Sequence, residues 1–138
     1  MEATKLQIVI KTPVNPTEDK KKVALCLHNI IDKPVIQEED NYLVVRSEHQ
    51  NILLTIRAKL GQQRIGETAR MIFLRNSTSS TFEFYLNKQA AFAGRVNFVT
   101  NIDQEDYLGP ITVTVTAEEV HTVIDWLAGS TSPPEEER

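Results

Sequence analysis

The chain has 138 residues, of which 41% are hydrophobic and 25% are charged. This length and composition are typical of a single globular domain, and they exclude a disordered, collagen-like or low-complexity chain. The single cysteine, Cys26, excludes an intramolecular disulfide and a zinc site built from several cysteines. Because no apolar run approaches the ~18 residues of a membrane span, we expect a soluble, cytoplasmic protein with no membrane partner.

Charge is distributed unevenly along the chain, although the formal net charge is only −4. Residues 44–100 carry eight basic and three acidic side chains, whereas residues 101–138 carry nine acidic side chains and one basic. Six of the eight central cations are arginines, whose planar guanidinium groups bind phosphate in a bidentate manner and stack on bases. The central segment therefore favours an anionic partner such as nucleic acid, unless these charges simply mix with acidic side chains on the folded surface.

The N-terminal third predicts a strand, a helix and a second strand. Apolar and polar residues alternate over residues 5–11, as in a half-buried strand. Thr17 is expected to cap a helix that ends at Lys33 and Pro34, because apolar residues recur between these points at helical spacing. Residues 42–46 form the second predicted strand.

The middle of the chain predicts two helices and a third strand. The helices cover residues 51–60 and 64–75 and are separated at Gly61. A polar loop rich in serine and threonine follows over residues 76–81. Residues 82–86 alternate again and form the third strand.

The last third is expected to hold a short helical turn, two strands and a final helix. The turn covers residues 87–94 and ends at Gly94. The strands are residues 95–99 and 111–115, with an acidic loop over residues 101–110 between them. Thr116 and Glu119 match a capping box, which predicts the start of a helix that ends at Gly129.

We expect residues 1–130 to form one domain and residues 131–138 to form a disordered acidic tail, because the tail has no large apolar residue to bury. The predicted class is α+β, since strands and helices mix without strict alternation. The alternating strands leave one polar side, which an antiparallel sheet tolerates. We therefore predict a single, mainly antiparallel sheet with helices packed on one face.

Signatures of catalysis are missing from the sequence. It contains no glycine-rich phosphate loop, no nucleophile elbow and no His-Glu-x-x-His motif. The three histidines are far apart, and Cys26 with His28 lacks the spacing of zinc ligands. Acidic residues at 103, 105 and 106 lack the remainder of a calcium loop. We therefore predict no catalytic residues, no metal site and no cofactor.

The predicted helix over residues 64–75 carries the first candidate site. Arg64 and Arg75 fall on one flank of that helix, about 16 Å apart at 1.5 Å per residue, a span that covers two or three phosphates. Arg70 lies on the other flank, three residues after Glu67, with which it is expected to pair. The alternative is an arginine-rich face that contacts only solvent.

The second candidate site lies within residues 82–98, where aromatic, amide and basic side chains alternate. Such a mixture supplies stacking surfaces, hydrogen bonds to base edges and charge for phosphates. The alternative is a strand–turn–strand unit whose phenylalanines are core and whose polar residues cap the turn. The candidates in this segment are Tyr85, Asn87, Lys88, Gln89, Phe92 and Arg95.

Five runs of residues stand out as motifs: NPTED at 15–19, RIGETAR at 64–70, LNKQAAF at 86–92, LGPI at 108–111 and IDWL at 124–127. Together they resemble one archaeal family of uncharacterised proteins that are described as RNA-binding or exosome-related. The resemblance spans residues 6–131 and implies an archaeal cytosolic protein. It also implies an α+β fold similar to that of the ribosomal protein that binds 5S rRNA. It assigns no catalytic residues.

The leading hypothesis is a non-catalytic RNA-binding protein that contacts phosphates through the central arginines and lysine. The acidic pI of about 5.4 stands against it, because nucleic-acid-binding domains commonly exceed ~9. A second hypothesis is a protein-interaction or assembly subunit, a homodimer or a partner of RNA-processing or ribosomal proteins. A third is an enzyme that acts on a phosphorylated small molecule held by Lys88 and Arg95.

Overall fold

The computed structural model describes residues 6–100 and 109–129 of the 138-residue chain. The strands are β1 (Gln7–Pro13), β2 (Gln37–Glu39), β3 (Tyr42–Ser47), β4 (Thr81–Leu86) and β5 (Ile111–Thr116). The helices are α1 (Lys20–Ile30), the 3-10 helix η1 (Gln50–Leu53), α2 (Leu54–Gln62), α3 (Gly66–Arg75), α4 (Lys88–Phe92) and α5 (Val120–Leu127).

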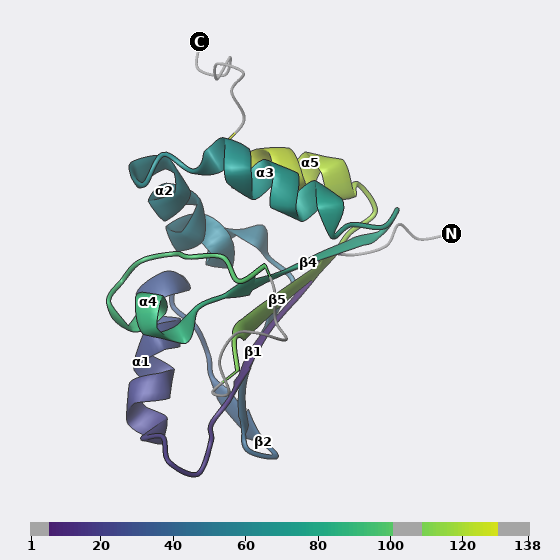
Figure 1. Cartoon of the computed structure of the whole chain (residues 1–138). Helices are drawn as coiled ribbons and strands as arrows, with labels where there is room; N and C mark the ends of the chain where they lie inside the picture. The colour runs from purple at the N-terminus through teal and green to yellow at the C-terminus, as the bar shows by residue number, and fades with distance from the viewer. Residues whose placement is uncertain (1–5, 101–108, 130–138) are drawn as a thin grey trace.

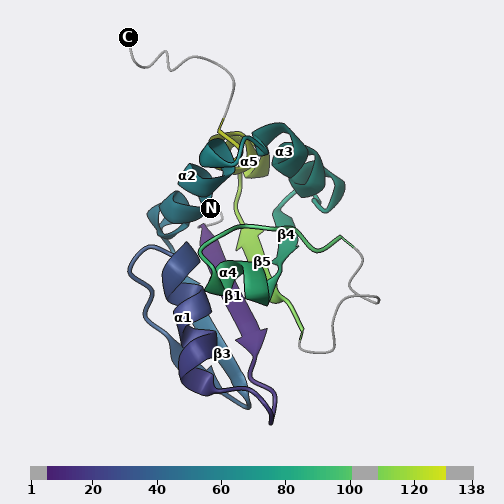
Figure 2. The ribbon, with the colours of Figure 1, turned by 60° about the vertical axis from the view of Figure 1, so that its left-hand side comes forward.

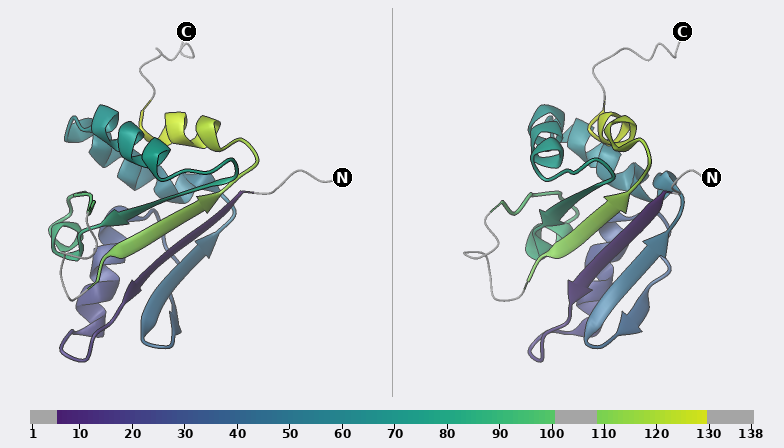
Figure 3. Two further views of the ribbon diagram at one scale, coloured as in Figure 1. Left: turned by 45° about the vertical axis from the view of Figure 1, so that its right-hand side comes forward. Right: turned by 90° about the vertical axis from the view of Figure 1, so that its right-hand side faces the viewer.

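The five strands form one sheet in the order β2-β3-β1-β5-β4, and every neighbouring pair is antiparallel. The described helices pack on one face of this sheet, and the other face is left open (Figures 1 and 3). Alternation explains this arrangement, because Ile8 and Ile10 of β1 are fully buried while Lys11 is exposed. The α+β prediction, with helices on one face of an antiparallel sheet, is confirmed.

Phenylalanines link the helical layer to the edge of the sheet. The Phe73 ring of α3 has its centroid 5.3 Å from that of Phe82 and 4.7 Å from that of Phe84, both on β4. Phe98, in the segment after α4, packs edge-on against Phe73 and Phe84. These tilted and edge-on contacts are the preferred geometries of aromatic pairs, so they hold α3 firmly over β4.

The strand predicted over residues 95–99 is wrong. The structure has a single bridge there, between Phe98 and Leu86 of β4. The side-chain amide of Gln63 explains the difference, because it donates to the Val96 carbonyl (2.8 Å) and accepts from the Val96 N–H (2.9 Å). Both polar backbone groups of Val96 are thereby bonded to the end of α2 rather than to a neighbouring strand.

Helix boundaries also depart from the prediction. Asp19, not Thr17, caps α1, and its carboxylate accepts from the Lys21 N–H (2.9 Å). Thr116 is the last residue of β5, and no side chain caps α5 at Glu119, so the predicted capping box is absent. α2 runs through Gly61 rather than ending there. The sequence interpretation also missed β2, which joins β3 through a turn at Asp40 and Asn41, both with positive φ.

Two of the predicted segments, residues 101–108 of the acidic loop predicted at 101–110 and the tail at 131–138, lie outside the described residues. None of the described helices is both long enough and apolar enough to cross a bilayer.

A buried ion pair connects β1, α1 and α4. Lys88 is 6% exposed, and its ammonium donates to the Glu18 carboxylate (2.9 Å) and to the Pro13 carbonyl (2.7 Å). Burial raises the pKa of Glu18, but hydrogen bonds from the Asn15 backbone and from Lys88 outweigh it, so that the pKa lies below its ordinary value. Lys88 therefore holds the fold together at this point, and its ammonium is withdrawn from the surface.

We predict that Lys88→Met lowers the free energy of unfolding by about 3–5 kcal/mol at pH 7, because the Glu18 carboxylate is left buried without its cation. A lowered carboxyl pKa contributes stability above the ordinary value of about 4.5, and that contribution is lost as the pH falls through the lowered pKa. The difference between variant and wild type should therefore shrink at pH 3 in urea unfolding curves. Recovery of part of the stability in Glu18→Gln/Lys88→Met is the control. An unchanged stability in Lys88→Met would contradict this role.

Candidate nucleic-acid interface

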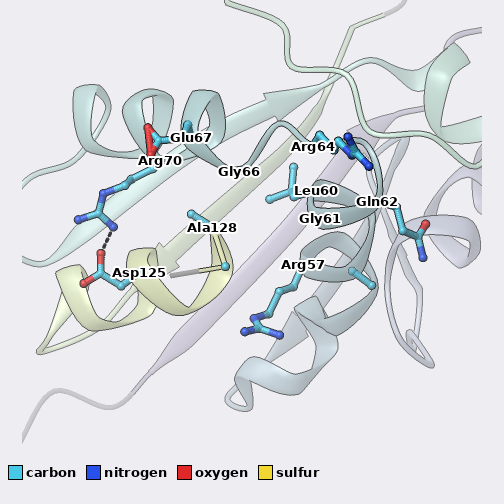
Figure 4. Close-up of a pocket in the computed structure, with 12 residues that line it drawn as sticks. Arg57, Leu60, Gly61, Gln62, Arg64, Gly66, Glu67, Arg70, Asp125 and Ala128 are labelled. Carbon is cyan, nitrogen blue, oxygen red and sulfur yellow. Dashed lines mark hydrogen bonds and ion pairs between the residues drawn. The ribbon is translucent and has the colours of Figure 1, made fainter. Parts of the chain in front are cut away.

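Helices α2, α3 and α5 enclose a cleft of about 810 Å³ on the helical side of the molecule (Figure 4). Its walls combine three arginines with two acidic side chains and with exposed backbone at glycines. We call it the basic cleft. The residues that line it are Arg57, Ala58, Leu60, Gly61, Gln62, Arg64, Gly66, Glu67, Arg70, Asp125, Ala128 and Gly129.

Arg57 is held at the cleft by the end of α5. Its Nε donates to the Trp126 carbonyl (2.6 Å), and its guanidinium carbon lies 5.4 Å from the centroid of the Trp126 ring. These two contacts orient the group through Nε and through its flat face. No hydrogen bond among the described residues takes its two Nη groups, which remain able to bind an oxyanion with two parallel N–H donors.

Arg64 occupies a backbone position that normally selects glycine. Its N–H donates to the Gly61 carbonyl (3.1 Å), and the next N–H, that of Ile65, donates to the Leu60 carbonyl (3.0 Å). This is a Schellman motif at the end of α2, and Arg64 adopts the left-handed conformation that the motif requires (φ 61°). The left-handed conformation is less favourable for arginine than for glycine. The exposed side chain of Arg64 nevertheless brings a positive charge to the cleft.

Arg70 and Asp125 form an ion pair between α3 and α5 (Figure 4). The predicted local pair of Arg70 with Glu67 is therefore wrong, because α5 packs beside α3 and presents a carboxylate from a distant part of the sequence. Both side chains are close to half exposed. The pair neutralises Arg70 and Asp125 together, so the cleft is positive because Arg57 and Arg64 outnumber the remaining carboxylate, Glu67.

The predicted flank with Arg64 and Arg75 on one helix does not exist. α3 begins at Gly66, so Arg64 belongs to the turn after α2, whereas Arg75 is exposed in the last turn of α3. The start of α3 lies against the end of α5, where a Cβ added to Gly66 would come within 2.6 Å of the Ala128 carbonyl oxygen. Glycine is required for this close approach.

We predict that Gly66→Ala lowers the free energy of unfolding by about 1–3 kcal/mol, because its methyl group collides with backbone that cannot rotate away. Gly61→Ala is the matched control. A Cβ at Gly61 meets no atom within 4 Å, and alanine favours a helix by up to about 1 kcal/mol. Thermal unfolding of both variants checks this. Equal stability of the two would show that α3 and α5 are not packed as described.

Basic residues continue from the cleft toward α4. The bond between Gln63 and Val96 holds the segment after α4 against the end of α2, and it brings their sequence neighbours Arg64 and Arg95 to one region of the surface. Nearby, a Cβ added to Gly94 would lie 4.0 Å from the Lys59 ammonium. In Figure 1 this segment runs from α4 past α2 before it reaches β4.

The structure separates the other predicted site residues. Asn87 caps α4, and its side chain accepts from the Ala90 N–H (2.8 Å). Lys88 belongs to the buried ion pair. Gln89, Phe92 and Arg95 are exposed on or after α4, so only these three remain on the helical surface from the second candidate site.

Tyr85 lies on the open face of the sheet, away from the basic cleft. Its hydroxyl donates to Glu83 (2.6 Å), whose other carboxylate oxygen accepts from Thr114 (2.7 Å). The hydrogen bond to Glu83, burial and the charge of Glu83 raise the pKa of Tyr85 to about 12. The phenol therefore stays neutral and bonded over the physiological pH range.

We predict that Tyr85 ionises near pH 12 and that Glu83→Gln returns its pKa toward the ordinary value of about 10. Because the folded state favours the neutral phenol, this group stabilises the protein fully below about pH 10. That contribution is lost as the pH rises through about 12. Alkaline titration of the tyrosine signal at 295 nm, with Tyr85→Phe to assign it, measures both values. Identical titrations of wild type and Glu83→Gln would contradict the bond.

The described residues contain no group of three or more histidine, cysteine, aspartate or glutamate side chains that could hold a metal ion. Cys26 is buried, and its thiol donates to the Lys22 and Lys88 carbonyls (both 3.4 Å). Burial raises the pKa of this thiol. Cys26 therefore packs as a small buried side chain.

Comparisons with known proteins agree on one family. A family model described as RNA binding matches residues 7–117 of the chain. A relative from Sulfolobus acidocaldarius is 33% identical and covers 94% of this chain and 99% of its own length. A relative from Methanothermobacter thermautotrophicus is 32% identical and covers 94% of this chain and 96% of its own length. The chain therefore belongs to the family that the RNA-binding model describes.

Both relatives are UPF0201 proteins, and so is a protein of known structure from Methanococcus jannaschii. That structure is 32% identical, with a TM-score of 0.77 over 92% of this chain and 96% of the other. A further structure from Methanothermobacter thermautotrophicus, a DUF54 protein, shares the fold at 16% identity and a TM-score of 0.60. The resemblance drawn from the sequence runs is thus confirmed at the level of the family.

Proposed function

We propose that this protein is a cytoplasmic, non-catalytic RNA-binding protein whose basic cleft contacts the phosphates of RNA. The observation that carries the proposal is Arg57, whose guanidinium is oriented by Trp126 and has no bonded partner at its Nη groups among the described residues. Membership of a family described as RNA binding supports it. The mechanism is binding alone, because the cleft offers hydrogen-bond donors and charge without a nucleophile paired to a base.

The local distribution of charge supports phosphate binding at the basic cleft, although the chain as a whole is acidic. Residues 54–75, which form α2 and α3, carry five basic side chains and one acidic side chain. Arg57 and Arg64 contact phosphates in the cleft, and Lys59 and Arg95 extend the positive surface beside it. Because each neutralised phosphate releases counterions, binding through such a surface weakens as salt rises.

An interaction with protein, a second copy of this chain included, is the alternative function. The exposed face of α3 favours it, because Met71 is 58% exposed and Leu74 is 37% exposed on the same helix. Two apolar side chains form a small patch compared with a stable protein interface. The protein partners proposed for this patch are RNA-processing or ribosomal proteins, which would bind it next to the bound RNA.

The test is salt-dependent binding of a mixed 12-nucleotide RNA by Arg57→Ala/Arg64→Gly. Glycine at position 64 removes the charge and relieves the left-handed backbone, which offsets the contacts to Trp126 that Arg57→Ala removes, so the variant should stay folded while its affinity falls. With a slope of about −0.7 per phosphate on single strands, the log–log salt slope should decrease in magnitude by about 1–2. Fluorescence anisotropy and circular dichroism measure these two quantities.

Arg46→Ala is the matched control, because Arg46 is an exposed arginine on β3 that pairs with Glu39 outside the cleft. It should bind RNA as the wild type does. Absence of binding at low salt in the wild-type protein would refute the proposed function. Equal affinities of the cleft variant and the control would remove Arg57 and Arg64 from it.

A further inference from the structure

We propose that the groove between α1 and α4 is a second site, which takes an unstacked base of single-stranded RNA on the ring of Phe92. The inference rests on the proposed function and adds to it the class of RNA and a separate binding site. The groove has a volume of about 370 Å³. The residues that line it are Thr17, Glu18, Asp19, Lys22, Val23, Cys26, Lys88, Gln89 and Phe92.

Phe92 exposes much of a large apolar ring beside the groove. Its side chain is 45% exposed, whereas Ala90 and Ala91 of the same helix are buried. Its backbone is held by other residues, because the Asn29 side chain donates to the carbonyls of Ala91 and Phe92 (3.0 Å each). The ring is therefore presented at a rigid point of the chain without being needed to fill the core.

Polar groups around the ring match the parts of a nucleotide. Gln89, exposed on α4, carries an amide that both donates and accepts, as the edge of a base requires. Lys22, exposed on α1, supplies a cation for the adjoining phosphate. The two carboxylates in the groove are already used, since Glu18 pairs with Lys88 and Asp19 caps α1.

A base can stack on an aromatic side chain only when it is not stacked inside an RNA duplex. This site therefore selects single-stranded RNA. The flat ring, an adjacent amide and a nearby cation form the same combination that single-strand-binding surfaces use. A duplex keeps its bases stacked inside and offers the protein its phosphates and minor groove instead. The groove therefore distinguishes the two forms of RNA, whereas the basic cleft contacts phosphates common to both.

The groove and the basic cleft are joined by one continuous segment. Shortly after α4 comes Arg95, whose N–H donates to the Ala90 carbonyl (2.8 Å), and then Val96, which is hydrogen-bonded to Gln63 at the C-cap of α2. Figure 2 shows α4 beside α1, with the segment that follows α4 leading away from it. Lys59 and Arg95 therefore lie between the two sites, where they supply charge for the phosphates of a strand that occupies both.

The experiment compares a fluorescent 12-nucleotide RNA, single-stranded or annealed to its complement, by anisotropy at low salt. Stacking contributes ~1–3 kcal/mol per base, so Phe92→Leu should weaken single-strand binding by about 5- to 150-fold. The same substitution should leave duplex binding unchanged, and Phe92→Trp should retain single-strand binding. Val35→Ala, at an apolar side chain that is 76% exposed outside the groove, is the control. Gln89→Ala tests the groove without altering the ring.

Single-strand binding that weakens in Phe92→Leu and Gln89→Ala, but not in Val35→Ala, supports the groove as the base site. Duplex RNA that binds as tightly as the single strand would overturn it. So would wild-type affinity in Phe92→Leu together with weakened binding in Arg57→Ala/Arg64→Gly, and that result would leave the proposed function intact. If the wild-type protein binds neither RNA, the proposed function itself fails, and the groove proposal fails with it.

Discussion

One-sided burial of the sheet is the constraint on which the rest of this structure depends. Most inward residues of β1, β4 and β5 are apolar, and the outward residues of β5 are three threonines. Helices can therefore pack on one face alone, and all of those described gather there. Their outward sides and their ends, which the sheet does not cover, become the surface that carries arginines and an exposed aromatic ring.

Helix ends build the basic cleft together with side chains from the bodies of the same helices. α2 ends in a motif that places Arg64 in a left-handed conformation, α3 starts at a glycine pressed against α5, and α5 ends with a carbonyl that holds Arg57. The two hydrogen bonds between Gln63 and Val96 also attach the segment after α4 to the end of α2, next to the cleft. Three regions that are distant in sequence, residues 57–66, residues 95–96 and the end of α5, thus converge at the cleft.

Local patterns predicted most of the fold and only part of the candidate site. Alternation located β1, β4 and β5 because one face of each is buried, and helical spacing located α1 and α3. β2 was missed because its three residues are all exposed and show no alternation. The expected strand at 95–99 failed because Gln63, more than thirty residues away, binds its backbone.

Contacts between residues that are distant in sequence also decide where the predicted site residues lie. Lys88 had the charge of a phosphate contact, but its partner Glu18 comes from a distant segment that sequence spacing cannot place beside it. Arg57 was not selected from the sequence, since its role depends on Trp126 of α5. Arg64 was selected for its charge, yet its position in a turn follows from the end of α2 rather than from helical periodicity.

Mapping amide chemical shifts while single-stranded RNA is added tests the central claim most directly, because it reports every described surface at once. The account predicts that the changes gather at residues 57–66 and 89–96 and at the indole N–H of Trp126, the single tryptophan of the chain. It also predicts that the open face around Lys11, Tyr42 and Tyr85 stays unchanged. Changes confined to that open face, with none at Trp126, would contradict it.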